Sequence, residues 1–359
     1  MKKQNIIAIV LFCAFLAVMA AGFFVPKPAF SEMEKRYLAT APKLSWKTLM
    51  DGSWGKQVEE YLTDHILGRN FFVGVHAYTE LLAGRQEISD IWLAEDKLLE
   101  APVALNESVV TRNMNAIRAF ADTVDQTVHV MVVPSAGWAA GVEGYTDQQT
   151  LAAIAEAGGG NVSVISVESI YSGRPDLYYD TDHHWTSRGA FYGYQAFTAA
   201  VGVEARPEQD FTVTQVPDFR GSTYSRSALW LFPGDTLELW QGCEGLTVTN
   251  AESEEVHEGI FYLDRLEEAD KYTVFLDGNH SLVRVTNPGK TGKVLVIRDS
   301  YSNCLGGFLA QSYGEVVLVD LRYYRQSVSS LVEAEGFDHI LVCYSCANFL
   351  TDTNLMLLK

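Results

Sequence analysis

Positive charge is scarce in this chain of 359 residues, because 27 Lys and Arg stand against 45 Asp and Glu, for a formal net charge of -18. Nucleic acids and anionic membrane surfaces attract clustered Lys and Arg, so this balance argues against both as the main partner. Cysteine is also scarce, and five residues do not make a disulfide-dense scaffold. The composition indicates neither disorder nor collagen nor a repeat array. The length therefore predicts one large globular domain or two ordinary ones.

The N-terminus is a long apolar run behind two lysines. Lys2 and Lys3 precede the run from Ile6 to Val25, which has no charged side chain. Twenty residues at about 1.5 Å each span the roughly 30 Å hydrocarbon core of a membrane. Positive charge on the N-terminal side favours an orientation with the rest of the chain outside the cytoplasm. We therefore predict a single-pass signal anchor over residues 1–25; secretion after cleavage near Val18-Met19-Ala20 is the alternative.

The rest of the chain divides by composition into a linker and an α/β domain. Residues 26–50 carry prolines and charges typical of a linker, and residues 51–359 are predicted as the folded domain. From about 201 to 285 the pattern changes to short strands and turns, which is typical of a β-rich insertion. Helical periodicity is found at about 54–66, 71–82, 110–124 and 190–200.

Apolar strands followed by polar loops define the sheet. "VHVMVV" at 128–133 and three later blocks, "KVLVIRDSYSN", "GEVVLVDLRYY" and "DHILVCYSCANF", each contain such a strand. Continuous apolar strands that alternate with helices indicate a parallel sheet covered on both faces. Ligands bind beyond the carboxyl ends of such strands. We therefore expect the loops beginning at Asp299, Asp320 and Cys343 to line one crevice.

Ser300 follows one of these strands directly and has two interpretations. A serine at a tight strand-to-helix turn exposes its hydroxyl near free backbone N–H groups, which suits a nucleophile with an oxyanion site. A helix N-cap, with Asn303 three residues later, accounts for the same position. A nucleophile would need a base.

The stretch "YYDTDHHWTSRGAF", at 178–191, supplies a candidate base. In Asp182-x-His184 a short turn can bring the carboxylate to one imidazole nitrogen and leave the other nitrogen free, as in a Ser-His-Asp triad. The alternative is that His184 and Trp185 pack while Asp182 caps the next helix. Thr186 or Ser187 could cap that helix equally well.

A metal site and a redox pair are the competing interpretations of the same composition. Asp180, Asp182, His183 and His184 are ligand-type residues, but adjacent residues in extended chain point to opposite faces, so we predict no metal site. Cys343 and Cys346 form a C-x-x-C that suits either a redox pair or two small residues at a strand end. A disulfide involving either of them or Cys304 stays open.

The block "TDHHWTSRGAFYGYQAF" resembles the signature of the DHHW family of exported bacterial proteins. The blocks "VFLDGNHSLVRV", "VLVIRDSYSN" and "VVLVDLRYY" are similar to later parts of that family. The family in turn is similar to the SGNH-hydrolase-like domain of the alginate O-acetyltransferase group. The resemblance implies a three-layer α/β fold with a parallel sheet. It also implies that Asp182 orients His184, which acts as base for the nucleophile Ser300.

The chain departs from the ordinary SGNH pattern at two points. It reads Arg298-Asp299-Ser300 where SGNH enzymes read Gly-Asp-Ser, and its Asp-x-His precedes the serine instead of following it. The reversed order, shared with the alginate group, implies a circularly permuted sheet. The further oxyanion or substrate-binding candidates that the resemblance suggests are Asn348, Arg322, His183 and Trp185. For Arg322, an ion pair with Asp320 is the alternative role.

These patterns together predict an exported, membrane-anchored serine-dependent enzyme of the cell envelope. The resemblance implies that the reaction is O-acetyl transfer to, or removal from, an extracytoplasmic polysaccharide, and serine-dependent acyl transfer needs no cofactor. An exported enzyme lacks acetyl-CoA, so transfer predicts a multi-span membrane acyltransferase as the partner that delivers the acyl group. The alternative function is a catalytically inactive SGNH-like protein that binds glycan or acts as a scaffold.

Overall fold

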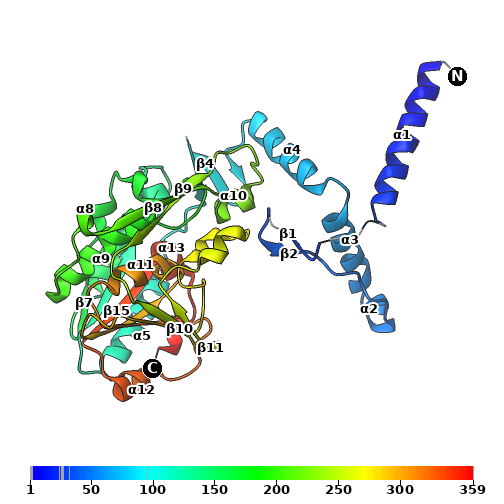
Figure 1. The fold of residues 1–359 in the computed structure, drawn as a ribbon. Coiled ribbons are helices and arrows are strands. Elements are labelled where there is room, and N and C mark those ends of the chain that lie inside the picture. The colour runs from blue at the N-terminus through cyan, green and yellow to red at the C-terminus, as the bar shows by residue number, and fades with distance from the viewer. Residues whose placement is uncertain (1–2, 24, 26–27, 32, 95, 359) are drawn as a thin grey trace. The chain divides into compact units, whose positions relative to one another are not determined.

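The computed structural model describes residues 3–23, 25, 28–31, 33–94 and 96–358 (Figure 1). Lys2, which was predicted to orient the anchor, lies outside the described residues. The chain forms two compact units, Met1–Ser89 with Tyr224–Phe232 and Asp90–Thr223 with Pro233–Lys359. The predicted α/β domain begins at residue 51, within the first unit, so the predicted domain boundaries stay a prediction.

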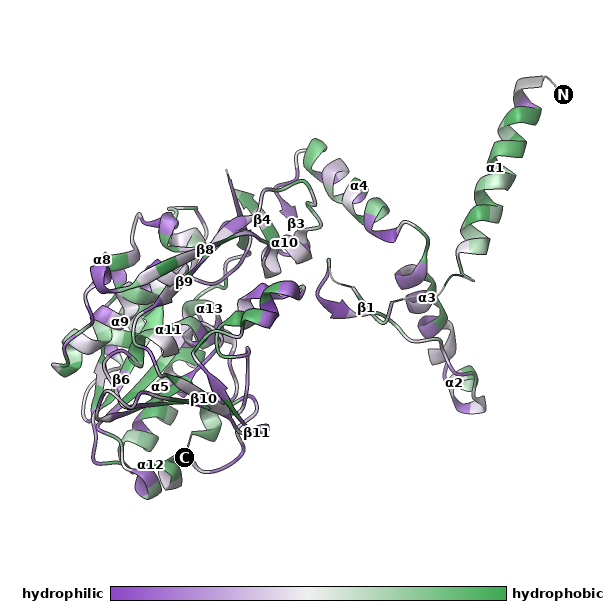
Figure 2. Ribbon diagram, viewed as in Figure 1, coloured by the Kyte–Doolittle hydropathy of each residue, from purple (hydrophilic) through white to green (hydrophobic). Residues whose placement is uncertain are grey.

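The first unit begins with one long apolar helix. Helix α1 (Lys3–Gly22) is hydrophobic along most of its length, as Figure 2 shows, and Asn5–Gly22 is long and apolar enough to cross a membrane. A signal sequence has the same properties. The other elements of this unit are β1 (Phe30–Ser31), β2 (Arg36–Tyr37), α2 (Trp46–Met50), α3 (Ser53–His65), α4 (Arg69–Leu82) and β3 (Glu87–Ile88).

The second unit is built on an eight-stranded mixed sheet. Its strand order is β11-β10-β12-β14-β13-β15-β6-β7, and the five strands from β14 to β7 are parallel. The strands are β6 (Val128–Val133), β7 (Val162–Val164), β10 (Thr247–Asn250), β11 (Ser253–Glu258), β12 (Leu282–Thr286), β13 (Lys293–Arg298), β14 (Glu315–Val319) and β15 (His339–Ser345). Two antiparallel pairs stand apart from it, β4 (Ile91–Ala94) with β5 (Lys97–Glu100) and β8 (Thr212–Phe219) with β9 (Asp235–Gln241).

Helices cover both faces of this sheet. The longer ones are α5 (Glu107–Ala121), α7 (Asp147–Glu156), α9 (Ser187–Val201), α11 (Ser302–Leu309) and α12 (Val328–Glu335). The shorter ones are α6 (Ala136–Ala139), α8 (Glu168–Tyr171), α10 (Ser222–Ser227, shared between the units) and α13 (Cys346–Thr351). The 3-10 helices are η1 (Pro175–Leu177), η2 (Glu208–Asp210), η3 (Leu263–Glu267), η4 (Lys271–Val274) and η5 (Leu355–Leu357).

Strand β13 shows why both faces need cover. Its residues Val294 and Val296 pack into one buried core with α9 and α11, while Leu295 and Ile297 pack into a second core with α5, α12 and α13. Successive side chains of a strand point to opposite faces, so a strand buried on both sides must be apolar throughout. The prediction of a sheet with helices on both faces is confirmed by these two cores.

The strand predictions hold in most places and fail at one loop. The apolar runs at 128–133, 293–298, 315–319 and 339–345 are strands of the parallel part of the sheet. The loop expected to begin at Cys343 was wrong, because the apolar strand continues to Ser345. Within the predicted insertion, β10, β11 and β12 extend the main sheet, whereas β8 and β9 form a separate pair. Its status as an insertion and the circular permutation stay predictions.

Candidate active site

The stretch Thr181–His184 is a series of bends held by hydrogen bonds from outside it. The Asp235 carboxylate accepts from the backbone N–H groups of Asp180 at 2.8 Å and Thr181 at 2.9 Å. Tyr178 and Trp185 form an isolated antiparallel bridge on either side of the bends. Helix α9 then begins, capped by Thr186, whose side chain accepts from the Gly189 N–H. Asp182 is therefore not the cap of that helix and remains available to His184.

A continuous hydrogen-bond chain joins Asp182, His184 and Ser300. Asp182 Oδ1 lies 2.5 Å from His184 Nδ1, and His184 Nε2 lies 2.9 Å from Ser300 Oγ. The carboxylate only accepts, so the proton is on Nδ1 and Nε2 can accept from the serine hydroxyl. Asp182 Oδ1 also accepts from the His184 backbone N–H at 3.0 Å, which fixes carboxylate and imidazole to one another.

Asp299 fixes the turn that presents Ser300 at the end of β13. Its Oδ1 accepts from the Tyr301 N–H at 3.0 Å, and its Oδ2 accepts from the Ser345 N–H at 2.8 Å and from Asn348 Nδ2 at 2.7 Å. Ser345 ends the neighbouring parallel strand β15. The Asp299 carboxylate thus ties the ends of two strands together beneath the serine, and no side-chain cap by Ser300 is found at α11.

The chain of three side chains is buried among aromatic rings. Asp182, His184 and Ser300 are 4%, 5% and 9% exposed. The His184 ring stacks on Tyr272 of η4 with centroids 3.9 Å apart and an interplanar angle of 11°. Burial, followed by the charge of His183, lowers the pKa of His184 below its ordinary value, although Asp182 opposes the shift. A buried imidazole of lowered pKa stays neutral and can accept a proton.

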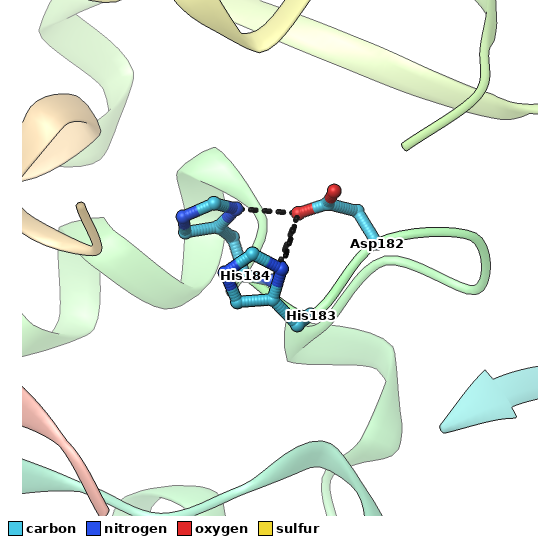
Figure 3. Close-up of side chains that lie close together, drawn as sticks. All are labelled: Asp182, His183 and His184. Carbon is cyan, nitrogen blue, oxygen red and sulfur yellow. Dashed lines mark hydrogen bonds and ion pairs between the residues drawn. The ribbon is translucent and has the colours of Figure 1, made fainter. Parts of the chain in front are cut away.

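The expectation that His183 and His184 point to opposite faces was wrong. Their ring centroids lie 3.9 Å apart, and Figure 3 shows both imidazoles turned towards the Asp182 carboxylate. The reason is that the backbone here is bent and not extended. The ligand atoms of the three side chains lie within 4.8 Å of one another. Each histidine already has another partner, Ser222 Oγ for His183 Nδ1 at 2.6 Å and Ser300 Oγ for His184 Nε2.

The further site candidates occupy different surroundings. Asn348 donates one N–H of its Nδ2 to Asp299 at 2.7 Å and so supports the turn; its role towards an oxyanion stays a prediction. The Arg322 guanidinium pairs with Asp320, with Nη2 at 2.6 Å from Oδ2, which is its alternative role. Trp185 is fully buried and donates to the Tyr301 carbonyl at 3.0 Å, so it packs against the residue that follows Ser300. His183 is partly exposed.

A small cavity of about 40 Å³ adjoins Asp182 and His183. Its lining includes Tyr301, Ser345 and Asn348, and it extends to β5 and the start of α6. Of the further candidates, His183 and Asn348 line this cavity, next to the buried Asp182.

The departure at Arg298 has a structural reason. Arg298 is fully buried, and its Nη1 donates to the side chains of Asn279 and Asn303. Burial lowers the pKa of its guanidinium, which the charge of Asp320 opposes. The arginine therefore braces the start of α11 from within, at the position where a glycine precedes the Asp-Ser pair in ordinary SGNH sequences.

The two cysteines of the C-x-x-C are free and buried. All five cysteines lie in the described ranges, and none of them is in a disulfide. Burial raises the pKa of the Cys343 thiol to about 12, and that of Cys304 likewise to about 12. Cys346 is also buried, and its pKa is raised well above the ordinary value. Thiols in this state are poor nucleophiles, which favours packing as their role.

Sequence reasoning missed several residues of the site. Tyr272 stacks on His184 from a 3-10 helix, and the Tyr301 ring lies 5.1 Å from the His184 ring and 6.1 Å from the His183 ring between centroids. Ser222 contacts both Asp182 and His183. Only Tyr301 carried a signal, since it follows Ser300 in the "RDSYSN" block.

The family resemblance is confirmed over the region that carries the site. The model of the DHHW protein family matches residues 160–319. A DHHW family protein from Eubacterium siraeum is similar in structure, with a TM-score of 0.66 and 19% identity over 76% of this chain and 97% of that one. Bacillus cereus PatB1, solved with a sulfonyl adduct, has a TM-score of 0.64 and 20% identity over 75% and 98%. At such identities these likenesses show a shared fold. No curated protein matches the chain in sequence.

Proposed function

We propose that this chain, which shares its fold with DHHW family proteins, is a serine-dependent O-acyltransferase or acyl esterase of the cell envelope. The observation that carries the proposal is the chain of hydrogen bonds from Asp182 through His184 to Ser300. Three residues of these types in this order of contact have the division of labour of an acyl-transfer triad.

The proposed chemistry proceeds in two steps. Ser300 Oγ attacks the acyl carbonyl while its proton passes to His184 Nε2, and the bond to the leaving oxygen breaks as that oxygen takes the proton. The product is a serine ester. A hydroxyl of a sugar or of water then gives its proton to His184 and attacks the ester carbonyl; the bond from the carbonyl to Ser300 Oγ breaks, and Oγ takes the proton back from His184. Asp182 stabilises the imidazolium in both steps.

The acyl group and its acceptor follow from the family resemblance. We propose acetyl as the acyl group and an extracytoplasmic polysaccharide as acceptor or substrate. Helix α1 would hold the chain at the membrane, with the second unit outside the cytoplasm. For transfer, a multi-span membrane acyltransferase would supply the acyl group. Acetyl transfer and acetyl removal use the same three side chains and differ in the acceptor.

Covalent labelling of the full-length chain tests the proposal. An aryl sulfonyl fluoride, the class of reagent that leaves a sulfonyl group on an activated nucleophile, is expected to modify Ser300 once per chain, as read by peptide mass spectrometry. His184→Ala should slow the labelling strongly because the hydroxyl loses its base. A chain that neither takes the label nor turns over an aryl acetate would be a glycan-binding or scaffold protein. Turnover that chelation abolishes, without labelling, would instead indicate a metal at Asp182 and the two histidines.

The pH dependence of turnover reports on His184. The base must be neutral, and burial lowers the pKa of His184 from its ordinary 6.5. Neutral imidazole therefore persists at pH values where an exposed histidine is already protonated, and kcat/KM should fall with acidification through an apparent pKa below about 6.5. The measurement is kcat/KM for an aryl acetate against pH. An acid limb centred well above 6.5 would contradict His184 as the base in this environment.

A further inference from the structure

The second oxygen of the Asp182 carboxylate is held by a distant segment of the same unit. While Oδ1 faces His184, Oδ2 accepts from the backbone N–H of Ser222 at 2.6 Å. The preceding Gly221 donates its own N–H to Thr181 Oγ1 at 3.2 Å. Residues 221 and 222 lie about forty positions after Asp182 in the chain. They thus donate hydrogen bonds to Thr181 and to the oxygen of Asp182 that does not face His184.

Gly221 lies so close to Asp182 that no side chain fits between them. A Cβ atom at position 221 would lie 2.2 Å from Asp182 Cβ and 2.3 Å from its Oδ2. Contacts under 3.0 Å force something to move, and the carboxylate itself is the atom group in the way. The close approach is what lets the Ser222 N–H reach Oδ2, so glycine is required here by space and not by a positive φ.

Ser222 also contacts the second histidine through its side chain. Ser222 Oγ lies 2.6 Å from His183 Nδ1, and the His183 ring lies against His184 with centroids 3.9 Å apart. Its backbone N–H and its hydroxyl therefore serve two different residues of the site. As the first residue of helix α10, Ser222 has an N–H with no partner inside the helix, so this donor is available to Asp182.

We propose that Gly221 and Ser222 are positioning residues for the orienting carboxylate of the triad. The Ser222 N–H fixes the rotation of Asp182 so that Oδ1 meets His184 Nδ1, and the Ser222 hydroxyl separately fixes the His183 ring at the cavity. This inference rests on the proposed function for its kinetic consequence, but the geometry that it assigns can be measured without catalysis.

Two substitutions at one position separate the two roles. Ser222→Ala removes the hydroxyl and keeps the N–H, whereas Ser222→Pro removes both. Proline is tolerated at the first position of a helix, but its Cδ takes the place of the N–H that meets Asp182 Oδ2 at 2.6 Å, so the carboxylate must turn away from residue 222. We expect kcat/KM of Ser222→Pro to lie at least about 10- to 100-fold below that of Ser222→Ala, because the loss of one hydrogen bond to a charged group has this size and the displaced carboxylate adds to it.

The acid limb of the plot of kcat/KM against pH distinguishes a positioning role of Ser222 from a merely structural one. A carboxylate that turns away from His184 stabilises the imidazolium less, so the acid limb of Ser222→Pro should move to lower pH than that of Ser222→Ala. The low-field proton signal of His184 Nδ1–H, identified by its loss in His184→Ala, should shift in Ser222→Pro and stay in place in Ser222→Ala. Gly221→Ala should displace or abolish the same signal.

The measurements on the full-length chain are decisive in each direction. The inference would be overturned if Ser222→Ala and Ser222→Pro had the same acid limb of kcat/KM and the same His184 Nδ1–H signal. If the unmutated chain shows the signal but turns over no ester, the proposed function fails, and the signal alone still decides the positioning role. Should Ser222→Pro not fold, the Ser222 amide of the unmutated chain is expected to exchange slowly with solvent, and fast exchange would overturn the inference.

Discussion

Replacement of Ser300 by alanine is expected to lower kcat for aryl acetate hydrolysis by about 10⁴-fold or more. The reason is that Ser300 Oγ is the atom at 2.9 Å from His184 Nε2, and no other hydroxyl of the described residues is hydrogen-bonded to that nitrogen. Alanine leaves the backbone turn intact, since Asp299 holds it through the Tyr301 N–H. The variant should therefore melt at nearly the same temperature as the unmutated chain.

Ser330→Ala is the matched control for this change. Ser330 is an exposed serine on α12, so its loss removes the same hydroxyl far from the triad in sequence and outside the site's contacts. Its kcat should remain within about twofold of the unmutated value, as for most surface substitutions. Equal activity of Ser300→Ala and Ser330→Ala would remove Ser300 from the reaction.

The parallel part of the sheet could be predicted from the sequence, because a strand that is buried on both faces is apolar at every position. Strands such as Val294–Ile297 and Val128–Val133 are apolar without alternation, and their short length and their β-branched residues distinguish them from buried helices. The end of β15 was placed too early, although Cys343 and Tyr344 are residue types that buried strands commonly hold. Their burial is set by the neighbouring strands β13 and β6, which local sequence does not reveal.

The side chains proposed for catalysis could be predicted from the sequence, but the residues that position them could not. Asp182, His184 and Ser300 were found by residue type and by resemblance. Ser222 contributes a backbone N–H, which any residue but proline possesses, and Gly221 contributes only the lack of a side chain. Tyr272 contributes a ring face. Such contributions depend on how distant segments pack, so no motif marks them.

The paired orientation of the two histidines shows the same limit. The prediction that they diverge assumed an extended backbone, in which neighbouring side chains alternate. The hydrogen bonds from Asp180 and Thr181 to Asp235 bend the chain instead. Asp235 lies more than fifty residues later, so the bend that brings the rings together is a tertiary effect.

Replacement of Asp182 by asparagine is expected to lower kcat by about 10⁴-fold while the chain stays folded. Both carboxylate oxygens face donors, His184 Nδ1–H and the His184 N–H at Oδ1, and the Ser222 N–H at Oδ2. An amide has one oxygen for these three donors. If the asparagine NH₂ faces the Ser222 N–H, two donors point at each other. If the NH₂ faces His184 instead, Nδ1 must become an acceptor and the imidazole proton moves to Nε2.

The second arrangement accounts for the size of the expected loss. With the proton on Nε2, His184 would donate to Ser300 Oγ instead of accepting from it, so the hydroxyl would lose its base although every heavy atom kept its place. Asp176→Asn is the matched control, because Asp176 is an exposed carboxylate whose partner Arg174 is also exposed, and its kcat should hardly change. The two variants are compared by single-turnover acylation and by the rate of sulfonyl labelling at Ser300. Acylation by Asp182→Asn at the rate of Asp176→Asn would mean that Asp182 does not set the tautomer of His184, and the triad would reduce to a serine and a histidine.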